Sequence, residues 1–319
     1  MNSPLLNMLA MFLVVNSHLD SVYPIETLAT GGSIGNSIGN SIFFALSGYG
    51  LAMSFKKARA TFVTWYIRRV KRIYPTVVVV IGVACLIGLE QVNGLFSLLQ
   101  VLIWPTSFWF IEAILLFYIL FYGVERFLGL DKSIYMLLFL FVPYFIFYYS
   151  FVDLTYFSIE APGHFKWLFY FQIMLLGAYI ASKDVEVICR KKYKWLLLTL
   201  TVFVYFGIKI MLKMTGHMEY QFAVHLSTFP LIFFIFVSIG SVKLKNGLVS
   251  RFVGLFGGVA FEVYLIHVYI LHSNILNKLE FPVNLIVFLF MAFSLAILTS
   301  KVLASIASIY EKRLVVSHE

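Results

Sequence analysis

The stretch FPVNLIVFLFMAFSLAILTSKV (residues 281–302) is almost entirely apolar, and its only charged residue, Lys301, lies at its end. A helix of about 20 residues is about 30 Å long, which matches the hydrocarbon core of a bilayer. The apolar residues are continuous rather than alternating, which favours a helix over a strand of a membrane barrel. This stretch therefore predicts a transmembrane helix.

The composition extends this prediction to the whole chain. Of 319 residues, 61% are hydrophobic and 12% are charged, whereas a soluble domain has roughly 45–50% apolar and about 25% charged residues. The 34 Phe, 19 Tyr and 5 Trp exclude a disordered chain. We therefore predict a polytopic membrane protein. Its net charge of +9 then indicates loops that face anionic membrane lipid and not nucleic acid.

The predicted fold is an all-α, polytopic transmembrane bundle of about ten spans. We treat residues 1–319 as a single membrane domain without an extramembrane domain. An apolar stretch at residues 95–104 is too short to cross, and we expect it to lie on or dip into the outer surface. The ten predicted spans lie near residues 4–20, 36–55, 75–92, 107–124, 133–151, 166–182, 195–212, 221–241, 252–273 and 281–302.

The distribution of basic residues predicts the orientation of these spans. Loops on one side of the predicted membrane carry 20 of the 24 Lys and Arg, which places that side in the cytoplasm. Both termini are then cytoplasmic. We expect the first run to be a retained span and not a cleaved signal peptide, because no basic residue precedes Lys56.

Ionisable residues inside a bilayer are costly and are therefore candidates for function. His18 and His267 lie at similar depths in two spans that run in the same direction, so they can face one cavity or be separately buried histidines. Glu262 is about 140° around the helix from His267 and can pair with a cation from another span. Lys209 can reach the membrane surface. The six candidates among the ionisable residues of the predicted spans are His18, Glu112, Lys209, His225, Glu262 and His267.

A basic cluster lies just before the third predicted span. Arg68, Arg69 and Arg72 occupy helical positions i, i+1 and i+4, so Arg68 and Arg72 share a face. Guanidinium groups bind phosphate through paired hydrogen bonds, and the cluster can hold a nucleotide-like cofactor or anchor the chain on anionic lipid. We expect Pro75 to separate the cluster from the span.

Glycines are frequent around the second predicted span. They lack the context of a phosphate-binding loop and instead predict close packing between helices. The glycines concerned are Gly31, Gly32, Gly35, Gly39, Gly48 and Gly50.

Five segments, in this order, resemble the membrane acyltransferase-3 family of integral membrane O-acyltransferases. The family usually has an arginine eleven residues before the histidine of the first segment, where this chain has Asn7. The five segments are VVNSH (residues 14–18), FFALSGY (43–49), RRVKRIYP (68–75), WFIEAILLFY (109–118) and FEVYLIH (261–267).

The resemblance implies transfer of an acetyl or other acyl group from cytoplasmic acetyl-CoA (acyl-CoA) to a hydroxyl of a surface or exopolysaccharide glycan. A bacterial inner membrane is implied, and no metal. His18 would be the general base or the acyl-carrying nucleophile. Ser47, Glu262 and His267 would complete the catalytic site. Arg68, Arg69 and Arg72 would bind the donor phosphates, and the remaining substrate-binding candidates are Trp109, Glu112 and Tyr264.

Two other functions fit the same composition. A transporter or flippase of a lipid-linked sugar would also be aromatic and contain buried histidines, and paired broken helices with internal symmetry would favour it. An inactive scaffold of a polysaccharide-export complex is the second alternative, and Asn7 favours it. Acyl transfer to a labelled product distinguishes the enzyme from both.

Overall fold

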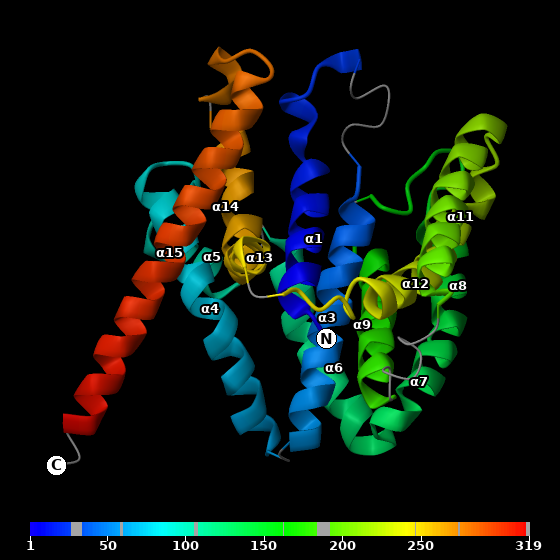
Figure 1. Cartoon of the computed structure of the whole chain (residues 1–319), viewed down its shortest axis with the longest axis horizontal. Coiled ribbons are helices and arrows are strands. Elements are labelled where there is room, and N and C mark those ends of the chain that lie inside the picture. The colour runs from blue at the N-terminus through cyan, green and yellow to red at the C-terminus, as the bar shows by residue number, and fades with distance from the viewer. Residues whose placement is uncertain are drawn as a thin grey trace.

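The computed structural model describes residues 1–26, 34–57, 60–104, 108–161, 163–183, 192–245, 247–273 and 275–316, with side chains up to residue 309. Throughout these ranges the regular structure is helical and contains no strand, so the all-helical prediction is confirmed (Figure 1). The long helices are α1 (Ser3–Asn16), α3 (Asn36–Lys57), α4 (Phe62–Leu86), α5 (Leu95–Ile103), α6 (Trp109–Leu128), α7 (Ser133–Phe139), α8 (Phe141–Phe151), α9 (Phe165–Ser182), α11 (Lys194–Thr215), α12 (Phe222–Ser238), α13 (Leu248–Gly258), α14 (Ala260–His272) and α15 (Val283–Val316). Short 3-10 turns connect some of them, at η1 (Leu19–Ser21), η2 (Leu130–Lys132), η3 (Met218–Tyr220) and η4 (Leu276–Lys278).

Helices cover all ten predicted apolar runs, but they do not all fit a bilayer equally well. Within the described residues, six are long and apolar enough to cross a membrane by themselves. Of the rest, α1 has only 14 residues, and α13 and α14 form one pair bent by 61°. Charged residues interrupt α4 and α6. Ten crossings and cytoplasmic termini therefore stay predictions.

The predicted boundary at Pro75 is wrong, because this proline lies inside α4. A proline within a helix removes one backbone hydrogen bond, which weakens the helix locally. The helix nevertheless continues, so the basic cluster and the apolar residues that follow it belong to one continuous helix. The packing of the apolar part of α4 in the bundle therefore also fixes the position of the arginines.

Glycines bring the central helices unusually close together. A β-carbon on Gly48 of α3 would overlap the carbonyl oxygen of Met174 on α9, and one on Gly177 of α9 would overlap that of Ala45. A β-carbon on Gly39 would lie 2.8 Å from the carbonyl oxygen of Ala10 in α1. The packing prediction is confirmed at Gly39 and Gly48, and Gly177 makes a further close contact that was not predicted, as small residues permit close helix contacts.

Three of the predicted glycines have other outcomes. Gly50 has open space around it, so the packing prediction is wrong there. Gly31 and Gly32 lie outside the described residues.

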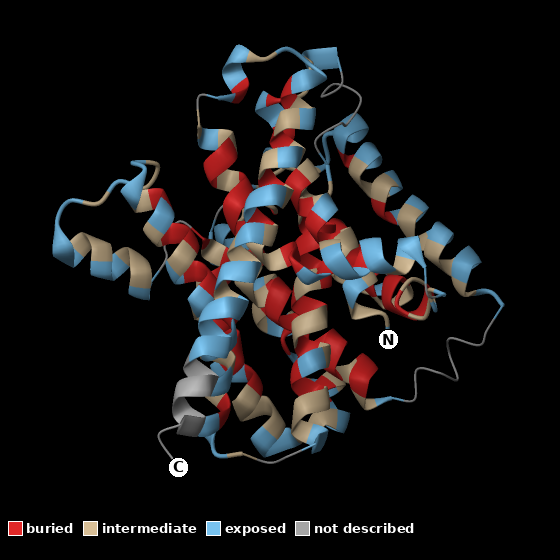
Figure 2. Cartoon of the chain, turned by 60° about the vertical axis from the view of Figure 1, so that its left-hand side comes forward, coloured by how far each residue is buried: buried red, intermediate tan, exposed pale blue. Residues whose placement is uncertain are grey.

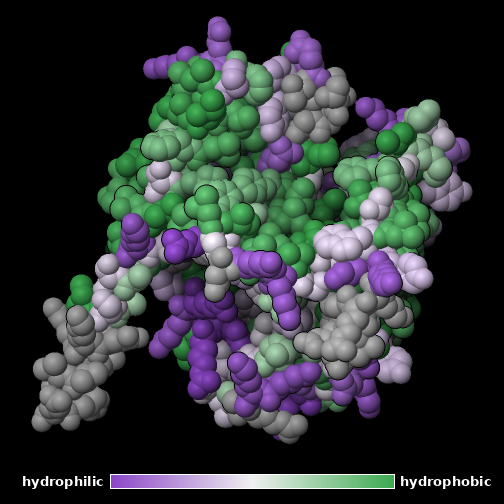
Figure 3. All heavy atoms as spheres, in the orientation of Figure 1, coloured by the Kyte–Doolittle hydropathy of each residue, from purple (hydrophilic) through white to green (hydrophobic). Residues whose placement is uncertain are grey.

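Burial separates central helices from peripheral ones. In the most apolar window of each helix, 67% of α9 is buried and only 11% of α11. Figure 2 shows buried residues gathered along the centre of the bundle and exposed residues on its outer faces. In Figure 3 a hydrophobic zone crosses the molecule above a strongly hydrophilic lower part. The outer apolar faces are those that lipid would cover.

The short helix α5 lies at the edge of the bundle and buries none of its residues. Leu95 is 72% exposed and Phe96 is 82% exposed. This agrees with the expected surface position, although its depth in a membrane stays a prediction.

Candidate active site

The structure brings His18 and His267 into contact, from helices far apart in the sequence. Their ring centroids are 5.2 Å apart and the rings are inclined by 48°. Helix α1 ends at Asn16, so His18 lies just beyond its end on exposed backbone, whereas His267 lies within α14 and is 1% exposed. One imidazole is thus accessible to a substrate and the other supports it from the interior.

The hydrogen bonding of His267 leaves one ring nitrogen unused. Its Nδ1 lies 3.2 Å from the carbonyl oxygen of Val263. A carbonyl only accepts, so Nδ1 carries the proton in this bond and Nε2 of the neutral ring is an acceptor. Nε2 is buried and has no partner within the described part of the chain. An unsatisfied buried acceptor is unfavourable, and an N–H or hydroxyl group facing His267 would relieve it.

Aromatic rings line the approach to this pair. The Tyr264 ring is 5.9 Å from that of His267 and 5.2 Å from that of Phe110. Phe110 also contacts Phe44 at 4.5 Å, and through this layer the contacts reach Trp109. Two predicted substrate-binding residues, Trp109 and Tyr264, therefore belong to the same aromatic layer as the histidines.

Within the described residues, the remaining predicted residues on this part of the bundle form no hydrogen bond, ion pair or ring contact with the histidine pair. Ser47 is half-buried on α3, one turn after Phe43, whose ring is 6.1 Å from that of Tyr264. Glu112 and Glu262 lie in the first turns of α6 and α14, where the helix dipole favours a carboxylate.

Glu262 does not form the expected ion pair. No cation lies within 4.0 Å of it among the described residues, and its Oε2 atom is buried without a hydrogen-bond partner there. Glu262 is near Val259, where α13 ends and α14 begins. No ion pair of Glu262 is therefore found among the described residues, and its place in the catalytic site stays a prediction.

The basic cluster lies at the other end of the bundle, since the start of α4 and the end of α1 point to opposite ends of the molecule (Figure 1). Arg69 is half-buried, with its guanidinium carbon 5.6 Å from the centre of the Trp65 ring, and its Nε has no partner in the described residues. Arg68 and Arg72 are exposed. None of the three forms an ion pair within the described ranges, so all three guanidinium groups can receive an anion.

Lys166 is a site residue that the sequence reasoning missed. It lies in the first turn of α9, with its Nζ atom 4.1 Å from the centre of the Trp109 ring, a cation–π contact. The available signal was the charge asymmetry, because Lys166 is one of only four basic residues outside the predicted cytoplasmic loops.

Two other ionisable residues have structural partners. Lys209 Nζ forms an ion pair with Glu160 at 3.2 Å, and its reach to the membrane surface stays a prediction. His225 is buried, receives or donates a hydrogen bond at 2.9 Å with Tyr144, and stacks on Phe169 at 3.7 Å. It is a packed core histidine and is excluded from the site.

The structure thus places an exposed histidine and a distant cluster of three arginines in one bundle of apolar helices, as expected of an integral membrane protein. Residues 5–304 match the acyltransferase domain of the acyltransferase-3 family. The chain belongs to this family and is a membrane acyltransferase. No curated protein and no solved structure shows significant similarity to it.

Proposed function

We propose that the protein transfers an acetyl group from cytoplasmic acetyl-CoA to a hydroxyl group of a cell-surface or exopolysaccharide glycan, or of its lipid-linked precursor, at a bacterial inner membrane. The observation that carries the proposal is that the arginine cluster and the histidine pair lie at opposite ends of the bundle. Guanidinium groups without counter-ions suit the donor phosphates at one end. The accessible His18, backed by His267, suits a nucleophilic hydroxyl at the other.

In the general-base mechanism, His18 takes the proton of the acceptor hydroxyl while its oxygen attacks the thioester carbonyl carbon. The carbon–sulfur bond then breaks, coenzyme A leaves as a thiolate, and the imidazolium returns its proton to the sulfur. In the covalent mechanism, the His18 nitrogen attacks the thioester carbonyl carbon, the carbon–sulfur bond breaks and coenzyme A leaves as a thiolate. The acceptor hydroxyl then attacks the acetyl carbon, the carbon–nitrogen bond breaks and frees the imidazole, and the hydroxyl proton passes to the thiolate sulfur. Both mechanisms yield an O-acetyl ester and free coenzyme A.

His267 is a positioning residue in either mechanism. Its unsatisfied Nε2 accepts a hydrogen bond from the His18 ring or from the acceptor, which holds the reacting groups in register. Trp109 offers an aromatic surface for a sugar ring. Lys166, which sits on that ring, offers a cation for an acidic or electron-rich substituent.

The proposal is tested by incubating the purified protein with labelled acetyl-CoA and glycan fractions. We expect label on a glycan, and on the protein itself if the covalent mechanism operates. A protein that binds or moves a saccharide but transfers no label would be a transporter, and the proposal would be wrong.

Reversing one charge of the basic cluster tests its role in donor binding. We expect Arg69→Glu to raise the acetyl-CoA concentration for half-maximal transfer at least tenfold, because a carboxylate replaces a group that would contact phosphate. Initial rates at varied donor concentration measure this. Lys301→Glu on α15 makes the same change of charge at another predicted cytoplasmic end and should have no such effect. Equal donor requirements in the two variants would show that the basic cluster only orients the protein in the membrane and does not bind the donor.

A further inference from the structure

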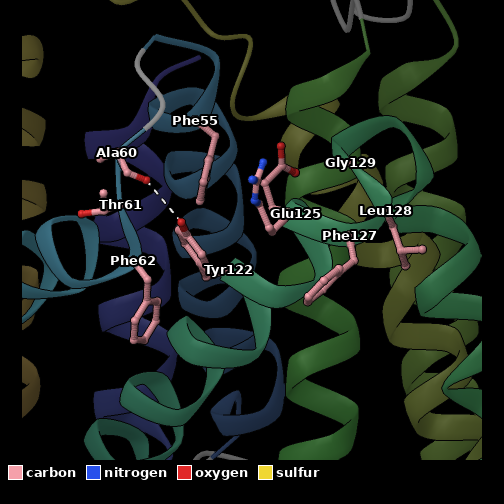
Figure 4. A pocket seen from close by; sticks show the side chains of 10 residues that line it. Phe55, Ala60, Thr61, Phe62, Tyr122, Glu125, Phe127, Leu128 and Gly129 are labelled. Carbon is pink, nitrogen blue, oxygen red and sulfur yellow. Dashed lines mark hydrogen bonds between the residues drawn. The ribbon is translucent and has the colours of Figure 1, made fainter.

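A pocket opens where α3 ends, α4 begins and α6 ends, next to the basic cluster. Its volume is about 680 Å³. Phe55, Phe62 and Tyr122 form one side of it, and Glu125 and Arg126 contribute charged groups (Figure 4). All of these residues lie at the end of the bundle that the charge distribution assigns to the cytoplasm. The pocket belongs to no part of the acyl-transfer site described above.

Aromatic rings line one side of this pocket, and contacts with neighbouring residues fix their orientation. The ring of Tyr122 is 5.6 Å from that of Phe55 and 5.1 Å from that of Phe62. The Tyr122 hydroxyl donates a hydrogen bond at 3.3 Å to the carbonyl oxygen of Ala60 (Figure 4). The Trp65 ring lies 5.2 Å from that of Phe55, between centroids. Fixed aromatic faces of this kind bind planar heterocycles by stacking.

The pocket and the basic cluster share helix α4. Seven residues separate Phe62 from Arg69, so the two are roughly 10 Å apart along the helix at about 1.5 Å per residue. Nearby Lys56 does not fill the space, because its Nζ donates a hydrogen bond at 2.8 Å to the carbonyl oxygen of Ala181 on α9. A ligand with an aromatic ring at one end and phosphates a few bonds away would satisfy both features.

We propose that this pocket binds the adenine ring of the acyl-CoA donor, with the ring against Phe62 and Tyr122. The phosphates then lie along Arg68, Arg69 and Arg72, and the pantetheine arm continues into the bundle toward His18. This assignment rests on the proposed function, since it names the site of the donor's base.

Phe62→Ala tests the pocket with two donors. Phe62 is 36% exposed at the first position of α4, so its removal should leave the fold intact. We expect the half-saturating acetyl-CoA concentration to rise about tenfold, which corresponds to about 1.4 kcal/mol. Transfer from S-acetyl-pantetheine, which has no nucleotide, should not change. Phe139→Ala removes a phenylalanine that is 63% exposed on α7, outside the pocket, and serves as the matched control.

A direct binding measurement separates this proposal from the proposed function. Calorimetry with adenosine 3′,5′-bisphosphate should show saturable binding to the wild-type protein and to Phe139→Ala, and about tenfold weaker binding to Phe62→Ala. An inactive wild-type protein that still binds the bisphosphate through Phe62 would overturn the function and leave the pocket in place. Unchanged binding by Phe62→Ala, or equal losses with both donors, would overturn the pocket.

Discussion

His18→Ala should reduce acyl transfer by at least about a hundredfold, since a general base contributes about 10²–10⁴ in rate and a lost nucleophile costs more. The protein should still insert into the membrane and remain folded, because the His18 side chain is exposed beyond the end of α1. Transfer of labelled acetyl to glycan, normalised to the amount of membrane-inserted protein, measures this effect.

A matched control for this variant is His217→Ala. His217 is also exposed, and its ring forms a hydrogen bond only with Glu219, two residues away, at 2.8 Å. It should retain wild-type transfer. If His18→Ala yields normal amounts of product, His18 has no part in the mechanism.

The contact between the two histidines extends this experiment. If His267 acts by positioning His18, the double variant should be no slower than His18→Ala alone, because residues that act as a unit have non-additive effects. His267→Ala by itself should lower kcat more than it changes the KM of the donor. Fully additive losses would instead indicate that the two rings work independently.

Gly48→Ala should produce the largest loss of stability in the bundle. The added β-carbon would overlap the carbonyl oxygen of Met174, so α3 and α9 would have to move apart. Overpacking a well-filled core costs about 1–3 kcal/mol, and contact with rigid backbone lies at the upper end of this range. Thermal unfolding of the purified protein in detergent measures the effect.

Gly50→Ala is the matched control, two residues further along the same helix. No atom lies within 4 Å of the added carbon, and alanine is more favourable than glycine in a helix by roughly 0.5–1 kcal/mol. This variant should be as stable as the wild type or more stable. A Gly48→Ala protein with unchanged thermal stability would show that the close contact of α3 and α9 does not determine the fold.

Much of the site could be predicted from local sequence. The matched depth of His18 and His267 follows from counting residues along two spans, and the structure indeed places their rings together. Helical spacing also indicated that Arg68 and Arg72 share a face. What spacing could not show is that Arg69 turns inward onto Trp65, because this depends on how α4 packs against its neighbours.

The sequence by itself determined that this is a helical membrane protein and which residues are available for chemistry. Hydropathy and charge are sums over neighbouring residues, so no tertiary contact is needed to read them. Only the tertiary structure decided which of those residues have partners. Lys209 proved to be paired with Glu160, and Lys166 to sit on Trp109. The aromatic pocket is likewise formed by the ends of three helices. Contacts between segments that are distant in the sequence depend on how the helices pack, and no local sequence pattern encodes this packing.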